Sequence, residues 1–208
     1  MFPRRAVLAG LAALAAAPRG AAAQTFQPSP EDRRDIARVE AYFEALRTLR
    51  ARFVQVSDQG AVAEGRLFIQ RPGRLRLDYA DPAKLLIVAT GGQLIQHDRE
   101  LKQTTYLLLS LTPAAVLLRE RVTLSGDVTV TGVARATGTV RISVVQTSDP
   151  RAGRITLVFG DRPFQLSSWI VVDGQGATTR VTLSEIETGM ALDPQLFVFR
   201  EEDSGRSN

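Results

Sequence analysis

The chain has 208 residues, of which 44% are hydrophobic and 23% are charged, with no cysteine and one histidine. The missing cysteines exclude disulfides, thiolate nucleophiles and cysteine metal sites, and we expect no acyl anchor on the protein itself. There are 26 basic and 22 acidic residues, but three of the arginines lie in the first 23 residues, which hold no acid. The remainder is nearly neutral and its arginines are scattered among acids, which argues against a nucleic-acid partner.

The first 23 residues have the pattern of a cleavable export signal. Two arginines at residues 4–5 precede an apolar run at residues 7–17, which is too short to span a bilayer. Alanines at residues 21–23 suit cleavage before Gln24. The paired arginines are also typical of a twin-arginine signal, so the twin-arginine and general secretory routes both stay open.

The sequence therefore predicts two parts, a signal peptide at residues 1–23 and a single domain at residues 24–208. A domain of this length can bury a sizeable core. No later segment is long and apolar enough to cross a membrane. We accordingly expect an exported protein.

A helix is predicted after a short polar linker. Ser29 suits the capping position, Pro30 suits the first helical position, and two acids follow at the positive end of the helix. Apolar residues then recur in steps of three and four, which predicts one apolar stripe made of Ile36, Val39, Phe43, Leu46, Leu49 and Phe53.

Beyond Arg52 the hydrophobic period changes from helical to alternating. Residues 74–79 alternate between apolar and charged, and the same pattern returns in residues 128–133, 140–145, 154–159 and 180–183. Short turn sequences rich in Gly, Pro and Asp separate the strands. Connections this short favour antiparallel hairpins, and we expect roughly ten or eleven strands.

One apolar segment interrupts the series of strands. Thr112 can cap a short helix, Pro113 can open it, and Ala114 to Leu118 are apolar. Such a helix is expected to lie on the apolar face of the sheet. A large sheet with one apolar face must either close around a filled core or curl over a cavity, and periodicity alone leaves both alternatives open.

The sequence offers few candidates for catalysis. His97 stands beside Asp98, a pair that more often forms a turn or surface contact than an acid–base couple. Glu185 and Glu187 alternate on a predicted strand, where a solvated face is the simpler interpretation. No nucleophile elbow or metal-binding motif occurs. We expect no catalytic residue, no metal and no cofactor, and keep a small hydrolase using His97 as an alternative.

Five segments carry a recognisable pattern in a fixed order: residues 46–55, residues 65–79 with an Arg-Pro turn, residues 85–96 with a Gly-Gly turn, the short helix at Thr112-Pro113, and residues 166–199. Taken in this order, they resemble the LolA family of periplasmic lipoprotein carriers. Each match is loose, but together they cover nearly the whole chain after the signal. The resemblance implies an α+β fold: a strongly curved antiparallel sheet, or incomplete β-barrel, closed by an N-terminal helix and a short lid helix around an apolar cavity.

The resemblance also implies roles for individual residues. Arg71 in the Arg-Pro turn is expected to hold the helical lid by hydrogen bonds to its backbone. Leu75 is expected to assist ligand transfer, and Leu77 and Tyr79 share its face by alternation. The lid and cavity wall are further expected to include Phe53, Ala114, Val116, Leu117 and Leu118.

The function implied is that of a monomeric periplasmic chaperone. It would take acylated outer-membrane lipoproteins from an inner-membrane lipoprotein-releasing ABC transporter to an outer-membrane receptor. This chain has leucines at sheet positions where many family members have aromatic residues, and its lid is small and aliphatic. A binder or sensor of other lipids with the same fold therefore remains the main alternative.

Overall fold

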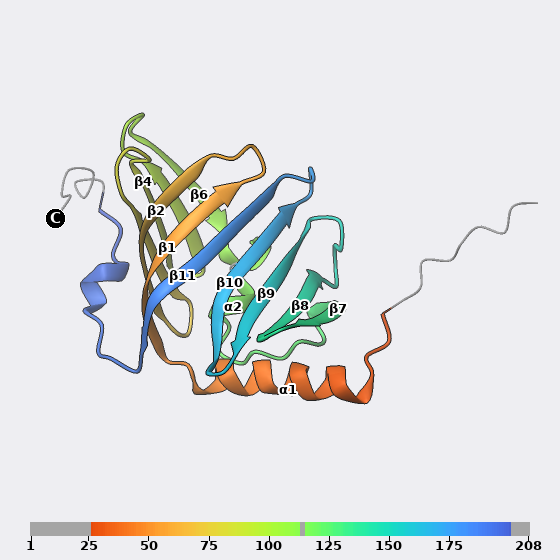
Figure 1. Ribbon diagram of the computed structural model, residues 1–208. Helices are drawn as coiled ribbons and strands as arrows, with labels where there is room; N and C mark the ends of the chain where they lie inside the picture. Colours follow the sequence, from red (N-terminus) through yellow and green to blue (C-terminus); the bar gives the residue numbers. More distant parts are fainter. Residues whose placement is uncertain (1–25, 113–114, 201–208) are drawn as a thin grey trace, which may run out of the picture.

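The computed structural model describes residues 26–112 and 115–200, and short turns join its strands into one antiparallel sheet (Figure 1). Roughly ten or eleven strands were expected, and the described residues form eleven. In chain order they are β1 (Thr48–Ser57), β2 (Val62–Gln70), β3 (Arg74–Tyr79), β4 (Leu85–Thr90), β5 (Gln93–Asp98), β6 (Gln103–Leu108), β7 (Val128–Ala136), β8 (Thr139–Gln146), β9 (Gly153–Asp161), β10 (Phe164–Asp173) and β11 (Thr178–Thr188).

The strand order explains why the barrel is incomplete. β1 pairs with β11 in the middle of the sheet, and hairpins run outward on both sides to β6 at one edge and β7 at the other. The connection between these two edges holds a 3-10 turn, η1 (Leu109–Leu111), and the short helix α2 (Ala115–Leu118). The predicted fold class, a curved antiparallel sheet with few helices, is confirmed.

The N-terminal helix α1 (Pro30–Ala45) begins where the sequence predicts. The Ser29 hydroxyl accepts a hydrogen bond from the backbone of Asp32, and the Asp32 carboxylate accepts one from the backbone of Ser29, which completes a capping box. The helix lies across one end of the curved sheet (Figure 1). Its Val39 and Phe43 are buried in the core that covers the inner face of the sheet.

The predicted helical stripe was wrong at its C-terminal end. Leu46 is already extended, and β1 starts at Thr48, so Leu49 and Phe53 belong to a strand. Both side chains are nevertheless buried in the same core. The error has a physical cause, because a spacing of four residues keeps two side chains on one face of either a helix or a strand.

A second apolar cluster lies on the outer face of β2–β5. Residues Phe68, Val88 and Ile95 lie in one cross-strand row with Arg76, and all three apolar side chains are buried. The 3-10 turn η2 (Pro194–Phe197) packs on β3 and β4 and buries Phe197 there. The chain after β11 therefore covers the sheet from outside, an arrangement that alternation within single strands did not predict.

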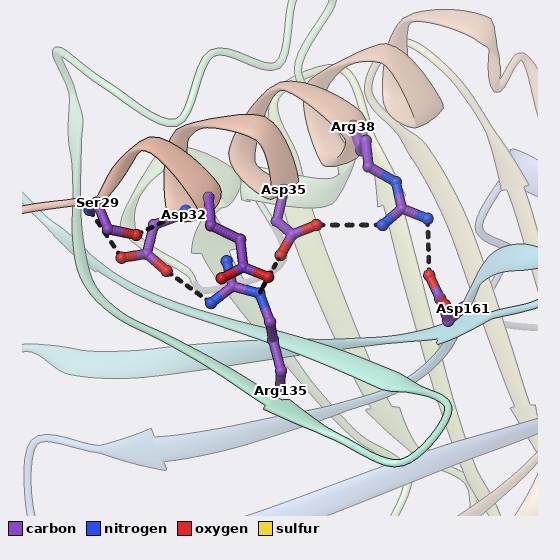
Figure 2. Close-up of polar contacts among 7 residues, drawn as sticks. Ser29, Asp32, Asp35, Arg38, Arg135 and Asp161 are labelled. Atoms are coloured by element: carbon purple, nitrogen blue, oxygen red, sulfur yellow. Dashed lines mark hydrogen bonds and ion pairs between the residues drawn. The ribbon is translucent and has the colours of Figure 1, made fainter.

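Ion pairs attach α1 to the far half of the sheet (Figure 2). From β7, Arg135 donates through Nη1 to Asp32 at 2.8 Å and through Nε to Asp35 at 2.6 Å. Arg38 joins Asp35 to Asp161 of β9, at 3.1 and 2.8 Å, and its guanidinium lies 4.1 Å from the centre of the Phe164 ring. We call the contacts of Arg135 with Asp32 and Asp35 the α1 clamp.

The described residues contain no helix that is long and apolar enough to cross a membrane.

The α1 clamp should make stability depend on pH. Hydrogen bonds from the Ser29 backbone and hydroxyl, and then from Arg135, lower the pKa of Asp32. A carboxylate with a lowered folded-state pKa stabilises the fold above its unfolded pKa, near about 4, and loses that contribution as the pH falls below it. Arg135→Ala should therefore lower the urea midpoint at pH 7.

The difference between Arg135→Ala and wild type should shrink as the pH falls below about 4 and through the lowered pKa of Asp32, because this carboxylate then becomes neutral in the folded protein as well. Arg141→Ala on β8, an exposed position, serves as the control and should leave the midpoint nearly unchanged. A difference between Arg135→Ala and wild type that is the same at pH 7 and pH 3 would contradict the clamp.

Candidate cavity and lid

An apolar cavity of about 180 Å³ lies between two parts of the curved sheet and is covered by α2. One wall comes from β3–β5, the other from β9 and β10, and the cover from the segment around α2. All but one of the lining residues are apolar: Leu75, Leu77, Ile87, Leu94, Leu117, Ile155, Trp169 and Val171, with Thr112 as the exception. Such a space can hold an apolar group but offers little to orient a polar one.

The structure brings three of the expected cavity residues together at this site. Leu75 and Leu77 line the wall from β3, and Leu117 lines it from α2. Val116 is buried on the other side of α2, where a narrower gap of about 30 Å³ separates it from β7–β9. Leu118 is also buried. Ala114 lies outside the described residues.

Phe53 and Tyr79 lie in the core but do not line this cavity. Register places Phe53, Gly65 and Tyr79 side by side on three neighbouring strands. The two rings meet across the glycine, edge to face, with centroids 4.9 Å apart. The Tyr79 hydroxyl donates to Gln55 Oε1 at 2.7 Å, and burial raises the pKa of Tyr79 to about 12. Together, Phe53 and Tyr79 form a packed floor for the inner face.

Arg71 is buried, with 6% of its surface exposed, in the turn between β2 and β3. Its Nη1 donates to the carbonyl of Leu46 at 3.1 Å, at the end of α1. Its Nη2 donates to the carbonyls of Arg119 and Glu120, directly after α2, the latter at 3.3 Å. Desolvation lowers the pKa of Arg71 and the Glu44 carboxylate opposes that shift, but a guanidinium stays charged at any physiological pH.

The same turn makes a backbone contact with α2. The amide of Gly73 donates to the carbonyl of Leu118 at 2.8 Å, so the end of α2 is held by both backbone and side chain of one turn. Gly73 has a φ of +74°, a conformation that favours glycine. The carbonyls at the end of a helix have no partner within the helix, and this turn supplies donors to them. We call the Arg71 and Gly73 contacts with residues 118–120 the lid contacts.

Sequence reasoning missed several lining residues. Ile87 and Leu94 face the cavity because they continue the cross-strand rows of Leu77 and Leu75 through β4 and β5. Alternation could have found this wall once the register was known. The opposite wall, with Trp169 and Val171, faces β3–β5 only because the sheet curves, and no local pattern records that.

His97 was expected in a turn or surface pair, and that prediction was wrong. The residue is on β5, 3% exposed, and its Nδ1 lies 3.0 Å from Thr104 Oγ1. The Phe199 ring lies 5.5 Å from the imidazole, so the chain after η2 covers it. This row of the sheet belongs to the outer face, which separates His97 from the cavity.

The alternating carboxylates of β11 are solvated, as expected. Glu185 is 2.9 Å from Arg52, and Glu187 is 2.7 Å from Arg50, with all four side chains exposed. Within residues 26–112 and 115–200, no group of three or more metal-ligating side chains comes together.

The aromatic floor depends on a missing side chain at Gly65. A Cβ there would overlap the carbonyl oxygen of Asp78 and lie 2.9 Å from the Phe53 ring. Gly65→Ala should lower the free energy of unfolding by about 1–3 kcal/mol, as overpacking typically does. Urea denaturation measures this change. In Gly132→Ala of β7, where no atom lies within 4 Å of the added Cβ, stability should change little. Equal stability of both variants would contradict this account of the floor.

Comparison with known proteins finds a family whose model matches this sequence. Residues 44–200 match the family model described as outer membrane lipoprotein carrier protein LolA. An outer-membrane lipoprotein carrier protein of Methylococcus capsulatus is 31% identical over 172 residues, covering 78% of this chain and 82% of the relative. One of Azotobacter vinelandii is 28% identical over 194 residues, covering 86% and 90%.

Among solved structures, a DUF1329 family protein from Desulfovibrio piger has a TM-score of 0.52 at 8% identity, covering 83% of this chain and 98% of that one. At this identity the likeness concerns the fold alone. The family match spans most of the chain, including β1 to β11, the Arg71 turn and the cavity walls. The chain belongs to the LolA family of outer membrane lipoprotein carrier proteins.

Proposed function

We propose that the protein is a periplasmic carrier that holds the acyl chains of lipoproteins in the cavity under α2 and releases them at the outer membrane. The observation that supports this most is the apolar cavity with a cover held by a few polar contacts. The family membership and the export-signal pattern of the first 23 residues agree with it. An inner-membrane lipoprotein-releasing ABC transporter as donor and an outer-membrane receptor as acceptor belong to the same proposal.

The cavity is small for the proposed cargo. Its volume of about 180 Å³ is below the roughly 300–1,000 Å³ of ordinary ligand pockets. Burial of each methylene contributes about 0.8 kcal/mol, so an acyl chain gains much by entering an enlarged cavity. Loading therefore requires α2 to move away, and the lid contacts are what such a movement must break.

In this proposal, closure of the lid drives release. Cargo and closed lid compete for the same apolar space, so the stability of the closed state subtracts from the affinity for acyl chains. A hydrogen bond to a charged group contributes about 1.5–3 kcal/mol. The Arg71 contacts can thus change the balance between loading and release by more than tenfold.

Arg71→Leu should therefore bind cargo but hand it over at least about tenfold more slowly, while it still folds, because closure no longer competes with the acyl chains. A transfer assay from loaded carrier to a purified acceptor measures the rate. Arg74→Leu, three residues away at an exposed site whose guanidinium contacts Gln70, is the matched control and should transfer normally. Normal handover by Arg71→Leu would remove the latch role.

The cargo can be identified directly on protein purified from the periplasm. Mass spectrometry should find co-purified acylated proteins, and a Leu94→Trp variant, which fills the cavity from β5, should carry several-fold less of them. The alternative of a binder of other lipids predicts free phospholipid or sterol without acylated protein. That result would replace the lipoprotein proposal and leave the apolar cavity as the site.

A further inference from the structure

A charged cleft of about 410 Å³ opens on the outer face of the sheet over β1–β3. Its lining includes four arginines and two acids: Arg52, Arg66, Arg76, Arg99, Glu64 and Asp78. The strand register places Arg52, Arg66 and Asp78 in one cross-strand row. Each of them is next in sequence to a member of the Phe53, Gly65 and Tyr79 row, so the two rows face opposite sides of the sheet. Phe53, Gly65 and Tyr79 also border the outer cleft, but no described residue lines both the outer cleft and the acyl cavity. The charged side chains of the cleft lie on the face of β3 opposite to Leu75 and Leu77, which line the cavity.

The two arginines at one end of the outer cleft are held in place. Arg76 Nε and Arg99 Nη2 both donate to the carboxylate of Asp78, at 2.7 and 3.1 Å, and Arg76 Nη1 donates to the carbonyl of Leu196 at 3.1 Å. Their side chains are only 12% and 15% exposed. Each guanidinium has five N–H donors, so these bonds use only part of the donor capacity.

The charges of the outer cleft do not cancel. Arg52 is neutralised by Glu185, which lies 2.9 Å away. Arg76 and Arg99 share one carboxylate, that of Asp78, which leaves a net charge of +1 at their end of the cleft. Preorganised arginines recognise phosphate and carboxylate oxygens through paired N–H donors. The site is thus suited to a singly charged oxyanion better than to an apolar or cationic group.

The volume indicates what carries that oxyanion. At about 410 Å³ the outer cleft lies within the roughly 300–1,000 Å³ range of small-molecule sites and exceeds what one isolated ion needs. A phosphodiester carries one negative charge, and its polar substituents would meet the remaining polar lining, including Ser184. We propose that the outer cleft is a binding site for a phosphodiester such as the headgroup of an anionic glycerophospholipid.

This inference goes beyond the carrier proposal and does not depend on it. A headgroup bound on the outer face cannot belong to a lipid whose chains fill the inner cavity, because the sheet lies between them. Its consequence is a contact with an anionic membrane surface through the outer face of β1–β3. Phosphate chemistry could also come from free inorganic phosphate, and the two sources can be separated by experiment.

The test uses the soluble headgroup glycerophosphoglycerol, which has no acyl chain and so cannot report on the inner cavity. Calorimetry should show one site whose affinity falls with salt. The variant Ala80→Glu/Ser184→Glu adds two negative charges at exposed lining positions and keeps every arginine, so folding should persist and affinity should fall roughly tenfold or more. Thr129→Glu, exposed on β7 at the far edge, should bind like wild type.

Two further probes identify the source of the phosphate. Binding to phosphatidylcholine vesicles only when they contain phosphatidylglycerol, and its loss in the double variant, supports the lipid headgroup. Inorganic phosphate that binds as tightly as the headgroup would overturn the lipid assignment. No measurable binding of headgroup at millimolar concentration, or equal binding by wild type and the double variant, would overturn the site itself.

Discussion

The buried guanidinium of Arg71 joins three parts of the chain that are distant in sequence. It belongs to the β2–β3 turn. It donates hydrogen bonds to the carbonyl of Leu46 at the end of α1 and to the carbonyls of the two residues that follow α2. A buried charge is tolerated only when hydrogen bonds compensate its desolvation, so breaking these contacts is costly unless water can enter. In the proposed function, the lid is therefore either closed, with these contacts made, or open, with these contacts broken.

The rest of the fold confines the proposed opening movement to α2. The inner face is fixed by aromatic packing of Phe53 with Tyr79, and the α1 clamp ties the N-terminal helix to β7. On the outside, η2 packs on β3 and β4. The walls of the cavity are thus supported from both faces of the sheet. By contrast, α2 spans only four residues and lies within the connection between the edge strands β6 and β7.

Local signals predicted the elements well. Ser29 and Pro30 mark the start of α1, and alternation such as that of residues 74–79 marks strands whose short turns force antiparallel pairing. The failures have a common cause in long-range contact. Leu49 and Phe53 fit a helix by spacing, and only pairing with β2 and β11 makes them strand residues. His97 looks like a surface residue until the C-terminal segment covers it.

The candidate site was predictable only in part for the same reason. Leu75, Leu77 and Leu117 could be proposed from alternation and from family resemblance, whereas Trp169 and Val171 line the cavity through the curvature of the whole sheet. Arg71 has no local signal that separates a lid contact from a solvated turn arginine, and its role rested on the resemblance. The outer cleft joins charges from β1, β2, β3 and the segment after β5, which no single motif contains.

In the proposed function, acyl chains enter by displacing α2 from the β2–β3 turn. The amide of Gly73, which donates to the Leu118 carbonyl at 2.8 Å, is a direct reporter of that contact. Hydrogen exchange of this amide can be measured by NMR on empty and acyl-loaded protein. It should be slow in the empty form and much faster in the loaded form, whereas the exchange rates of amides within the strands β1–β11 should be the same in the two forms. Equal protection of Gly73 in the two forms would contradict the account.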